Sequence, residues 1–571
     1  MFFTRRIGRA PQGSAPSGAS FSDRPSQTTI LGAAKLTGRT QGGLSVGVLG
    51  AVTAEESGRA YFAEGDSIAS FTAQPQAEQG VVRLQQDFGD GTSKVGILGT
   101  GIKRNLPGDG SFDFLPSEAY SFGLDFEHNW GGSRRRDFRL WGFYSASLVQ
   151  GSTTAITRLQ RSSLHYFQRP DATGFGLDST ATSMFGSDWH LQLERQSALH
   201  WTWSAWVGEQ SPGFDVNDLG FITSGERLDV GARLGYRQIR PGRLFRKYNL
   251  TLFSFANFRH SLFDDFTSGK NWARSFDTGS FFLSGNFTFL NNWDANLRSS
   301  YSPQGQSDTQ TRGGPLMTNP ARWSLSADVN TDRRAAVSVR PSFSYTQSAL
   351  GAGETIRTGI GFQFRPVPSW EIELGPNYSR QRTGAQYVTS SDALPFESTF
   401  GTRYIFGDLQ RQSVSMDTRL NVAFSPTASL QLFMQPLIST GDYRTYRQLQ
   451  NPESYDFLDF TEGEAVEGPD GFACVGGLTC VDNDVRFFDF DGDGTVDDST
   501  SDRDFNILSL RGNAVFRWEY RSGSQIFLVW QHTSRESRDF GDLSVGRDLG
   551  DLFSAPSENV FIVKVSQYLS F

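Results

Sequence analysis

The last fifteen residues of the chain, 557–571, read S-E-N-V-F-I-V-K-V-S-Q-Y-L-S-F. Apolar side chains recur at every second position, with Gln567 as the exception, and the set is Phe561, Val563, Val565, Leu569 and Phe571. The intervening positions are mostly polar and hold Ile562, Lys564, Ser566, Tyr568 and Ser570. A repeat of two residues predicts a strand with one apolar and one polar face. The chain is therefore expected to end in a strand whose last residue is aromatic.

The composition favours one large barrel over several soluble domains. With 571 residues the chain has room for either, yet only 37% of the residues are hydrophobic while 13% are aromatic. A soluble chain of this size normally buries a core rich in Leu, Ile and Val. Apolar residues spread over one position in two instead suit a barrel with lipid outside and water inside. No stretch approaches the roughly 18–20 consecutive apolar residues of a transmembrane helix, which excludes a helical membrane protein.

The net charge of −8 disfavours nucleic acid as a partner, because a protein that binds phosphate backbones carries a basic face.

Two cysteines, Cys474 and Cys480, lie six residues apart in a polar stretch. They are either free thiols or, in an oxidising compartment, the ends of a small disulfide ring. We favour the disulfide because the chain has no other cysteine to compete.

The N-terminus shows no signal peptide, because Arg5 and Arg6 follow almost directly after Met1. A barrel cannot reach an outer membrane without such a signal. We therefore expect that the signal peptide is missing from this chain, and interpret residues 1–27 as the remnant of a strand followed by a loop.

From residue 28 to 571 the period-two pattern repeats. In one run, Trp370, Ile372 and Leu374 alternate with Glu371 and Glu373. Charge opposite an apolar face predicts a wet lumen rather than a dry core. A first hairpin is expected from 28–38 and 44–49, around the glycines at 42 and 43.

The connections alternate between short and long. The short ones are 291–293, 332–334, 366–368, 426–428 and 522–523, and the long ones are 151–181, 304–320, 384–396, 443–504 and 537–556. Short periplasmic turns and long outer loops are typical of outer-membrane barrels. The sequence thus predicts an all-β fold, a large antiparallel transmembrane barrel of about 20–22 strands. Our count of about 21 is odd, and residues 1–9 or a preceding segment could supply one more strand to give the usual even number.

Two stretches break this rhythm. In 155–168, Ile156, Leu159, Leu164 and Phe167 have helical spacing, which predicts a short helix in an outer loop or in the lumen. Residues 213–221 (G-F-D-V-N-D-L-G-F) are expected to form a structured loop rich in carboxylate and amide groups.

A calcium-loop pattern stands at 489–497, D-F-D-G-D-G-T-V-D. Carboxylates at positions 1, 3, 5 and 9 with Gly at 6 let hard oxygen ligands converge on a tight turn. The candidate ligands are Asp489, Asp491, Asp493, Thr495 and Asp497. Position 12 is Thr500 where the pattern has Glu, and Asp498 or Asp502 could substitute. The alternative is a solvated acidic turn without metal. Any Ca²⁺ would be structural, and no other cofactor is expected.

Signals for an enzyme are poor, since the six histidines form no metal-binding pair and no nucleophile elbow is present. Asp215 and Asp218 could act as an acid and base pair. Isolated carboxylates in a polar lumen are far more often simply its lining. The tryptophans are interpreted mainly as girdles at the two membrane interfaces, with stacking on sugar rings as the alternative.

Several stretches together resemble a family of bacterial outer-membrane proteins of unknown function, in which a barrel follows a module like a family-nine carbohydrate-binding domain. These stretches are F-F-T-R-R-I-G-R (2–9), A-A-K-L-T-G-R-T (33–40), G-L-S-V-G-V-L (43–49), Q-R-S-S-L-H-Y-F-Q-R-P-D (160–171), S-P-G-F-D-V-N-D-L-G-F (211–221), T-R-G-G-P-L-M (311–317) and F-R-W-E-Y-R-S-G-S (516–524). The module itself is absent here. The resemblance implies a bacterial outer-membrane location, contact with membrane lipid, and a pointer to glycans.

The terminal strand also resembles the closing strand of such barrels, whose end is the signal read by the barrel-assembly machinery. Its residues here are Tyr568, Leu569 and Phe571.

The favoured hypothesis is an outer-membrane barrel, porin-like in transport, that passes or docks a glycan-related solute such as an oligosaccharide. Selection would come from lumen charge and outer loops, with no covalent step. One alternative is a membrane-embedded glycan hydrolase that uses lumen carboxylates. Another is a plugged structural or surface-attachment barrel, with the calcium-ordered loop 443–504 as its contact surface.

Overall fold

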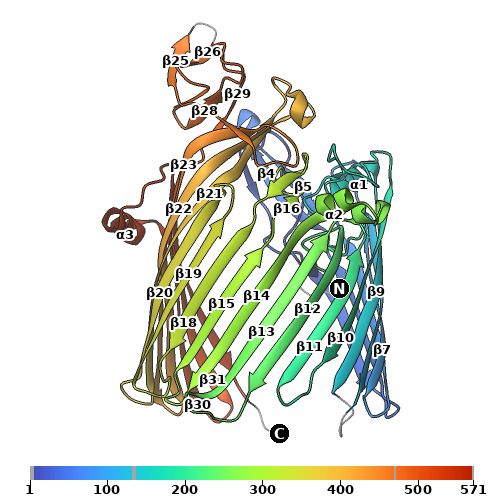
Figure 1. Ribbon diagram of the computed structural model, residues 1–571, viewed down its shortest axis with the longest axis vertical. Helices are drawn as coiled ribbons and strands as arrows, with labels where there is room; N and C mark the ends of the chain where they lie inside the picture. Colours follow the sequence, from blue (N-terminus) through green and yellow to red (C-terminus); the bar gives the residue numbers. More distant parts are fainter. Residues whose placement is uncertain (1–5, 132–136, 469–470, 569–571) are drawn as a thin grey trace. The chain divides into compact units, whose positions relative to one another are not determined.

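The computed structural model describes residues 6–131, 137–468 and 471–568. Twenty-two strands form one antiparallel sheet with barrel topology (Figure 1). One of them, β24 (Phe457–Asp459), pairs only with the outer end of β23 (Ala428–Leu449), so 21 strands form the wall within the described ranges. The fold predicted from the sequence, a large antiparallel barrel of outer-membrane type with about 20–22 strands, is confirmed. None of the helices in the described residues has both the length and the apolar character needed to cross a membrane.

The chain divides into two compact units. In the first, the wall strands are β2 (Ile30–Arg39), β3 (Leu44–Thr53), β6 (Ala77–Phe88), β7 (Ser93–Arg104), β8 (Glu118–Trp130), β9 (Phe138–Gln150), β10 (Ser183–Arg195) and β11 (Trp201–Gln210). A separate small sheet contains β1 (Phe21–Asp23), β4 (Glu56–Phe62) and β5 (Ser67–Gln74). The helices of this unit are α1 (Thr153–Gln160) and α2 (Gly269–Ser275), with 3-10 turns η2 (Ala63–Gly65) and η3 (His260–Asp264).

In the second unit, the wall strands are β15 (Asp294–Ser302), β18 (Arg322–Asn330), β19 (Val337–Ser348), β20 (Gly353–Phe364), β21 (Trp370–Ser391), β22 (Arg403–Ser425), β23, β30 (Phe505–Arg521), β31 (Ser524–Arg538) and β32 (Ser557–Ser566). Its outer loops hold β17 (Met317–Asn319), η4 (Glu397–Thr399), β24, β25 (Glu464–Gly468), β26 (Gly471–Val475), β27 (Thr479–Asp482), β28 (Val485–Phe488), β29 (Asp498–Ser501) and α3 (Val545–Ser554). Four strands have residues in both units: β12 (Arg227–Gln238), β13 (Phe245–Phe258), β14 (Phe276–Phe289) and β16 (Gly305–Ser307).

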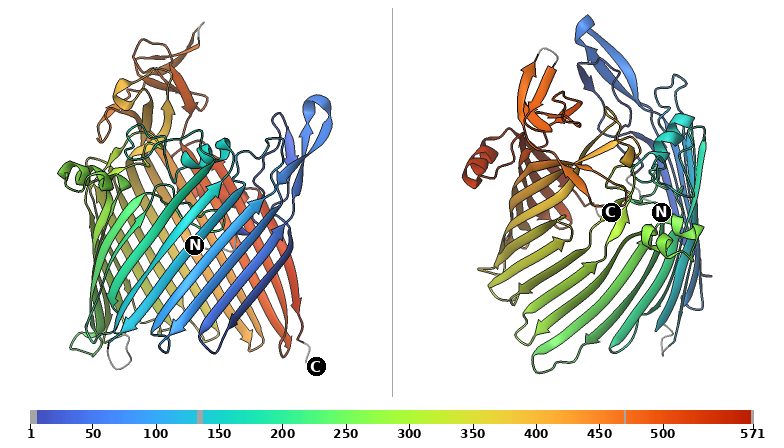
Figure 2. Two further views of the ribbon diagram at one scale, coloured as in Figure 1. Left: turned by 90° about the vertical axis from the view of Figure 1, so that its right-hand side faces the viewer. Right: turned by 45° about the horizontal axis from the view of Figure 1, so that its top comes forward.

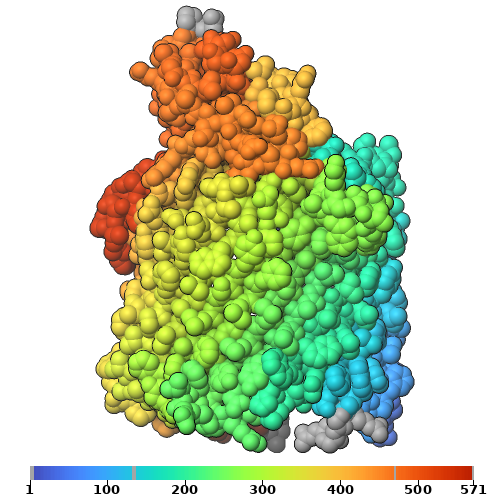
Figure 3. Space-filling view, viewed as in Figure 1, coloured from blue at the N-terminus to red at the C-terminus, as the bar shows by residue number. Residues whose placement is uncertain are grey.

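Strand pairing in the second unit sorts the side chains by polarity. Across β19 and β20, Val339 pairs with Phe362, while five residues further along β19 Ser344 pairs with Arg357. Apolar residues therefore share one face and polar residues the other, as a wall between lipid and water requires. Figure 3 shows the outer side of β15–β20, coloured green to yellow, as an open surface.

Three neighbouring strands, β21, β22 and β23, are 22, 23 and 22 residues long. A tilted strand crosses a bilayer in about 9–11 residues, so these strands continue beyond it. The outer half of β22 is buried, and the loop 450–504 packs Phe488 against Ile405 of β22 and Tyr446 of β23. This loop stands at the outer ends of β22 and β23 (Figure 2). The predicted loops 384–396 and 443–504 thus begin too early, because pairing carries β21 to Ser391 and β23 to Leu449.

One further expectation changes at its boundaries. The helix predicted for 155–168 is shorter, since α1 spans Thr153–Gln160 and the chain then turns through Tyr166 in the left-handed region at φ 47°. Ser152 caps this helix by accepting a hydrogen bond from the Ala155 N–H at 3.1 Å.

The ends of the chain are described in part. Residues 6–27 contribute β1 to the small sheet and no strand to the wall, while residues 1–5 lie outside the described ranges. The closing strand β32 ends at Ser566, and the Tyr568 N–H donates to Ser524 Oγ at 3.0 Å. The other two residues of the expected terminal signal, Leu569 and Phe571, are outside the described ranges.

The sidedness of β19 is tested by two adjacent substitutions. Phe343 lies on the apolar face and is 47% exposed, whereas Ser344 lies on the polar face. We expect Phe343→Arg to lower the free energy of unfolding by about 2–4 kcal/mol near the bilayer midplane, because the cation must enter lipid. The control Ser344→Arg should change it by less than about 1 kcal/mol. Urea unfolding in liposomes measures both, and equal losses would contradict the assignment of the two faces.

Candidate functional site

The acidic loop brings three of its five predicted ligands together. Ligand oxygens of Asp489, Asp491 and Asp493 all lie within 4.8 Å of one another. Asp489 is buried and accepts hydrogen bonds from the backbone N–H groups of Gly492 at 2.7 Å and Gly494 at 2.8 Å. Both glycines have left-handed φ values, 77° and 91°, which allow the chain to wrap around this carboxylate. The donor set is one that a hard cation such as Ca²⁺ accepts.

The other predicted ligands have different contacts. Asp497 Oδ2 accepts the Phe490 N–H at 2.7 Å and so closes the base of the loop. The Thr495 N–H donates to Asp493 Oδ1 at 2.7 Å. Of the two substitutes considered for position 12, Asp502 already binds Arg486 and Tyr446, and Asp498 accepts the N–H of Ser499. Calcium binding stays a prediction for Asp489, Asp491 and Asp493.

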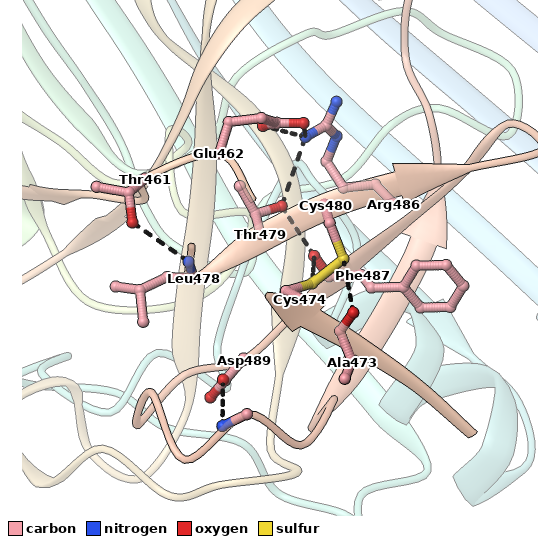
Figure 4. The surroundings of a disulfide bond; sticks show 11 residues. Thr461, Glu462, Ala473, Cys474, Leu478, Thr479, Cys480, Arg486, Phe487 and Asp489 are labelled. Carbon is pink, nitrogen blue, oxygen red and sulfur yellow. Dashed lines mark hydrogen bonds and ion pairs between the residues drawn. A yellow bond between two sulfur atoms is a disulfide. The ribbon is translucent and has the colours of Figure 1, made fainter. Parts of the chain in front are cut away.

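A disulfide and an arginine hold this loop together (Figure 4). Cys474 and Cys480 are joined at an S–S distance of 2.02 Å, which links β26 to β27. Arg486 forms ion pairs with Glu462 at 2.7 Å and Asp502 at 3.2 Å, and its guanidinium lies 4.2 Å from the centre of the Tyr446 ring. The loop is therefore a compact body tied to β23.

The candidate acid and base pair, Asp215 and Asp218, has separate partners. Asp215 is buried, and its Oδ2 lies 3.3 Å from Nε2 of the buried His165. Asp218 forms an ion pair with the buried Arg104. Each carboxylate is thus engaged in joining loop segments, His165 from 160–171 and Arg104 from the end of β7.

A buried ionic network that the sequence analysis did not predict connects the outer loops of the first unit. Asp308 Oδ2 lies 3.7 Å from Arg169 Nη1 and 3.6 Å from Arg259 Nε. Arg169 also pairs with Glu226 at 3.5 Å, and Arg259 with Asp277 at 3.3 Å. Both arginine side chains are 3% exposed. Burial raises the pKa of Glu226 to about 7, although Arg169 opposes the shift.

The polar face of the second unit contains two cavities, of about 540 and 440 Å³. Ser342 and Asn377 line both, so the cavities adjoin. Hydroxyl, amide and guanidinium groups from β18–β22 dominate the lining, with Arg340 in the first cavity and Arg357 in the second. This face therefore offers polar groups to which a solute could bind along the wall of this unit.

The family described as "Domain of unknown function (DUF5916)" matches residues 1–459 and 478–571. The chain belongs to this family. No curated protein matches it. In this DUF5916 chain the stretch 460–477, which lies outside the match, includes β25, β26 and Cys474, whereas the acidic loop lies inside.

Solved structures similar to this DUF5916 chain include three outer-membrane proteins. The FrpB iron transporter from Neisseria meningitidis has a TM-score of 0.37 and 9% identity, over 80% of this chain and 74% of that one. The ferric enterobactin receptor PfeA from Pseudomonas aeruginosa has a TM-score of 0.38 and 9% identity, over 86% and 76%. The siderophore receptor PirA from Acinetobacter baumannii has a TM-score of 0.33 and 8% identity, over 86% and 71%. Similarity at this level transfers no ligand to the DUF5916 chain.

The raised pKa of Glu226 gives the loops of the first unit a pH dependence. In the folded state the pKa of Glu226 is about 7, whereas in the unfolded chain this carboxyl has its ordinary pKa of 4.5. Stability from this group is therefore full below about pH 4.5 and is lost as pH rises to about 7. We expect amides of 211–226 to exchange hydrogen more slowly at about pH 5 than at about pH 7.5, after correction for intrinsic rates.

Glu226→Gln should remove most of this difference. Glu64→Gln, at an exposed carboxylate of η2 in the same unit, should leave it unchanged. A pH dependence that persists in the Glu226→Gln variant would show that another group causes it.

Proposed function

We propose that this chain is an outer-membrane barrel that passes or docks a glycan-related solute without a covalent step. The observation that carries the proposal is the pair of adjoining cavities on the polar face, lined by serine, asparagine, glutamine and arginine side chains. Such groups exchange hydrogen bonds with the hydroxyls of a sugar as they do with water. The resemblance to barrels preceded by a carbohydrate-binding-like module supports the same class of solute.

An outer-membrane location is supported by the apolar face and by its aromatic rim. Trp293, Trp370 and Trp518 all stand at the short-turn end of the second unit and are 42–46% exposed. Tryptophan prefers the membrane–water interface because its ring is apolar and its N–H is polar. These residues would contact lipid headgroups, and the terminal strand would be the part that the barrel-assembly machinery reads.

A second candidate function, surface attachment, is favoured by the outer halves of β21–β23. These strands are longer than is needed to cross the bilayer, and their outer ends hold a disulfide-bonded loop. The hydrolase alternative has less support, because Asp215 and Asp218 already have structural partners in His165 and Arg104.

Conductance of the purified, refolded chain in a planar bilayer tests passage of a solute. We expect steady single-channel currents that an added oligosaccharide blocks, because an occupied lumen excludes ions. Heat-modifiable mobility in the same preparation provides the control for insertion. A silent membrane that contains inserted protein would favour surface attachment.

We also propose that Asp489, Asp491 and Asp493 bind a structural Ca²⁺ that orders the loop 450–504. Calcium should slow proteolysis of this loop, and Asp491→Asn combined with Asp493→Asn should abolish that protection, because two of three carboxylates lose their charge. Glu464→Gln combined with Glu467→Gln removes the same charge elsewhere in the loop and should preserve it. Equal cleavage with and without chelator would refute the calcium site.

A further inference from the structure

A row of serine and arginine side chains crosses eight consecutive strands of the second unit. Strand pairing places each member directly beside the next, from β14 through β15, β18, β19, β20, β21 and β22 to β23. The members, here called the serine–arginine row, are Ser284, Arg298, Ser326, Ser344, Arg357, Ser379, Ser413 and Ser439. All lie on the polar face, which in a barrel of this class faces the lumen.

The two arginines of the row have no hydrogen bond or ion pair to any other residue within the described ranges. Arg298 and Arg357 are both exposed on the polar face. They are three strands apart, so their Cα atoms are about 14 Å from each other. Ser326 and Ser344 lie between them in the same row, and their hydroxyls likewise have no hydrogen bond to another described residue. Two guanidinium groups without a partner among the described residues thus lie on either side of two such hydroxyl groups.

Carboxylates near the row form no ion pair with these arginines, and amide groups donate to their oxygens instead. Asp328 Oδ2 accepts from Asn296 Nδ2 at 2.7 Å, and Asp417 Oδ1 accepts from Gln435 Nε2 at 2.7 Å. A neutral amide satisfies a carboxylate's hydrogen bonding and contributes no positive charge. The guanidinium N–H donors of these positively charged arginines are therefore left for something other than the wall.

The two cavities concentrate this charge. Six arginines line them, against three carboxylates: Arg298, Arg333, Arg340, Arg357, Arg365 and Arg419 against Asp328, Glu373 and Asp417. Of these arginines, Arg365 pairs with Glu371 at 3.1 Å. The chain as a whole has a net charge of −8, so an excess of arginine at this place is local. Rings of arginine or lysine are the means by which pores select anions.

We infer that the serine–arginine row binds oxyanion groups, and that the solute is an acidic saccharide rather than a neutral one. The inference rests on the proposed passage or docking of a glycan-related solute and names its chemical class. A guanidinium group binds a carboxylate or sulfate through two parallel N–H hydrogen bonds, and serine hydroxyls can donate to the remaining oxygens. Arg298 and Arg357 are the specificity-determining residues.

Calorimetric titration of the detergent-solubilised full chain tests the inference. The probes are trigalacturonate and, as its neutral counterpart, maltotriose. We expect trigalacturonate to bind more tightly, with an affinity that falls as salt screens the arginines. Arg298→Gln combined with Arg357→Gln should raise its Kd about tenfold or more, since charge-assisted hydrogen bonds are lost.

Two control variants distinguish the bidentate contact of Arg298 and Arg357 from a general effect of positive charge and from an effect on folding. Arg240→Gln combined with Arg243→Gln removes two charges from the turn between β12 and β13 and should leave the Kd unchanged. Arg298→Lys combined with Arg357→Lys keeps the charge without the fork and should give an intermediate Kd. Each variant is first checked for heat-modifiable mobility, and single Arg357→Gln replaces a double variant that does not fold.

Equal affinity for the two sugars, binding of neither, or a Kd unaffected by Arg298→Gln with Arg357→Gln would overturn the inference. Its failure is distinguishable from failure of the proposed function. If neutral sugar blocks the current and trigalacturonate is not preferred, passage through the lumen is supported and the oxyanion site is refuted. If trigalacturonate binds to a barrel that carries no current, docking at the oxyanion site is supported and passage through the lumen is refuted.

Discussion

The backbone hydrogen bond between neighbouring strands is the constraint on which this structure depends. Hydrocarbon offers no partner to a peptide N–H or C=O, so a membrane-crossing wall must satisfy these groups within the sheet. The antiparallel ladder does so, and it also fixes which side chains face lipid, because successive residues point to opposite faces. From this one requirement follow the apolar face of β19, the polar face that holds Arg357, and the cavities along it.

Beyond the bilayer the constraint relaxes, and other forces organise the chain. The outer half of β22 is buried by protein rather than lipid, with Ile405 against Phe488 of the loop. α3 covers Leu508 and Leu510 of β30 in the same way. Ion pairs are buried here too, such as Arg486 with Asp502 and Arg169 with Glu226, and each buried charge has a partner as its desolvation requires. The outer loops thus behave as small soluble folds fastened to strand ends.

The sequence predicts what is local and periodic. Alternation at Trp370, Ile372 and Leu374 identifies a strand, and Gly43 with its φ of 85° confirms the first hairpin turn. The ends of β21 and β23 are mispredicted, because pairing between distant residues extends them through stretches without alternation. The network of Arg169, Glu226 and Asp308 was missed because its members are 57 or more residues apart, and only the fold brings them together. Conversely, Asp215 and Asp218 are close in sequence and have different partners.

The serine–arginine row depends on register as well as on composition. A hairpin that slipped by two residues would still present apolar residues to lipid and polar residues to the lumen. Ser344 would nevertheless move about 7 Å along its strand, out of line with Arg357. The alternation of apolar and polar residues therefore cannot distinguish the native register from one shifted by two residues. The lengths of the short turns at the opposite end of the strands determine the register. Inserting or deleting two residues in the turn after β18 would therefore rearrange the side chains on the lumen surface without substituting any residue that lines it.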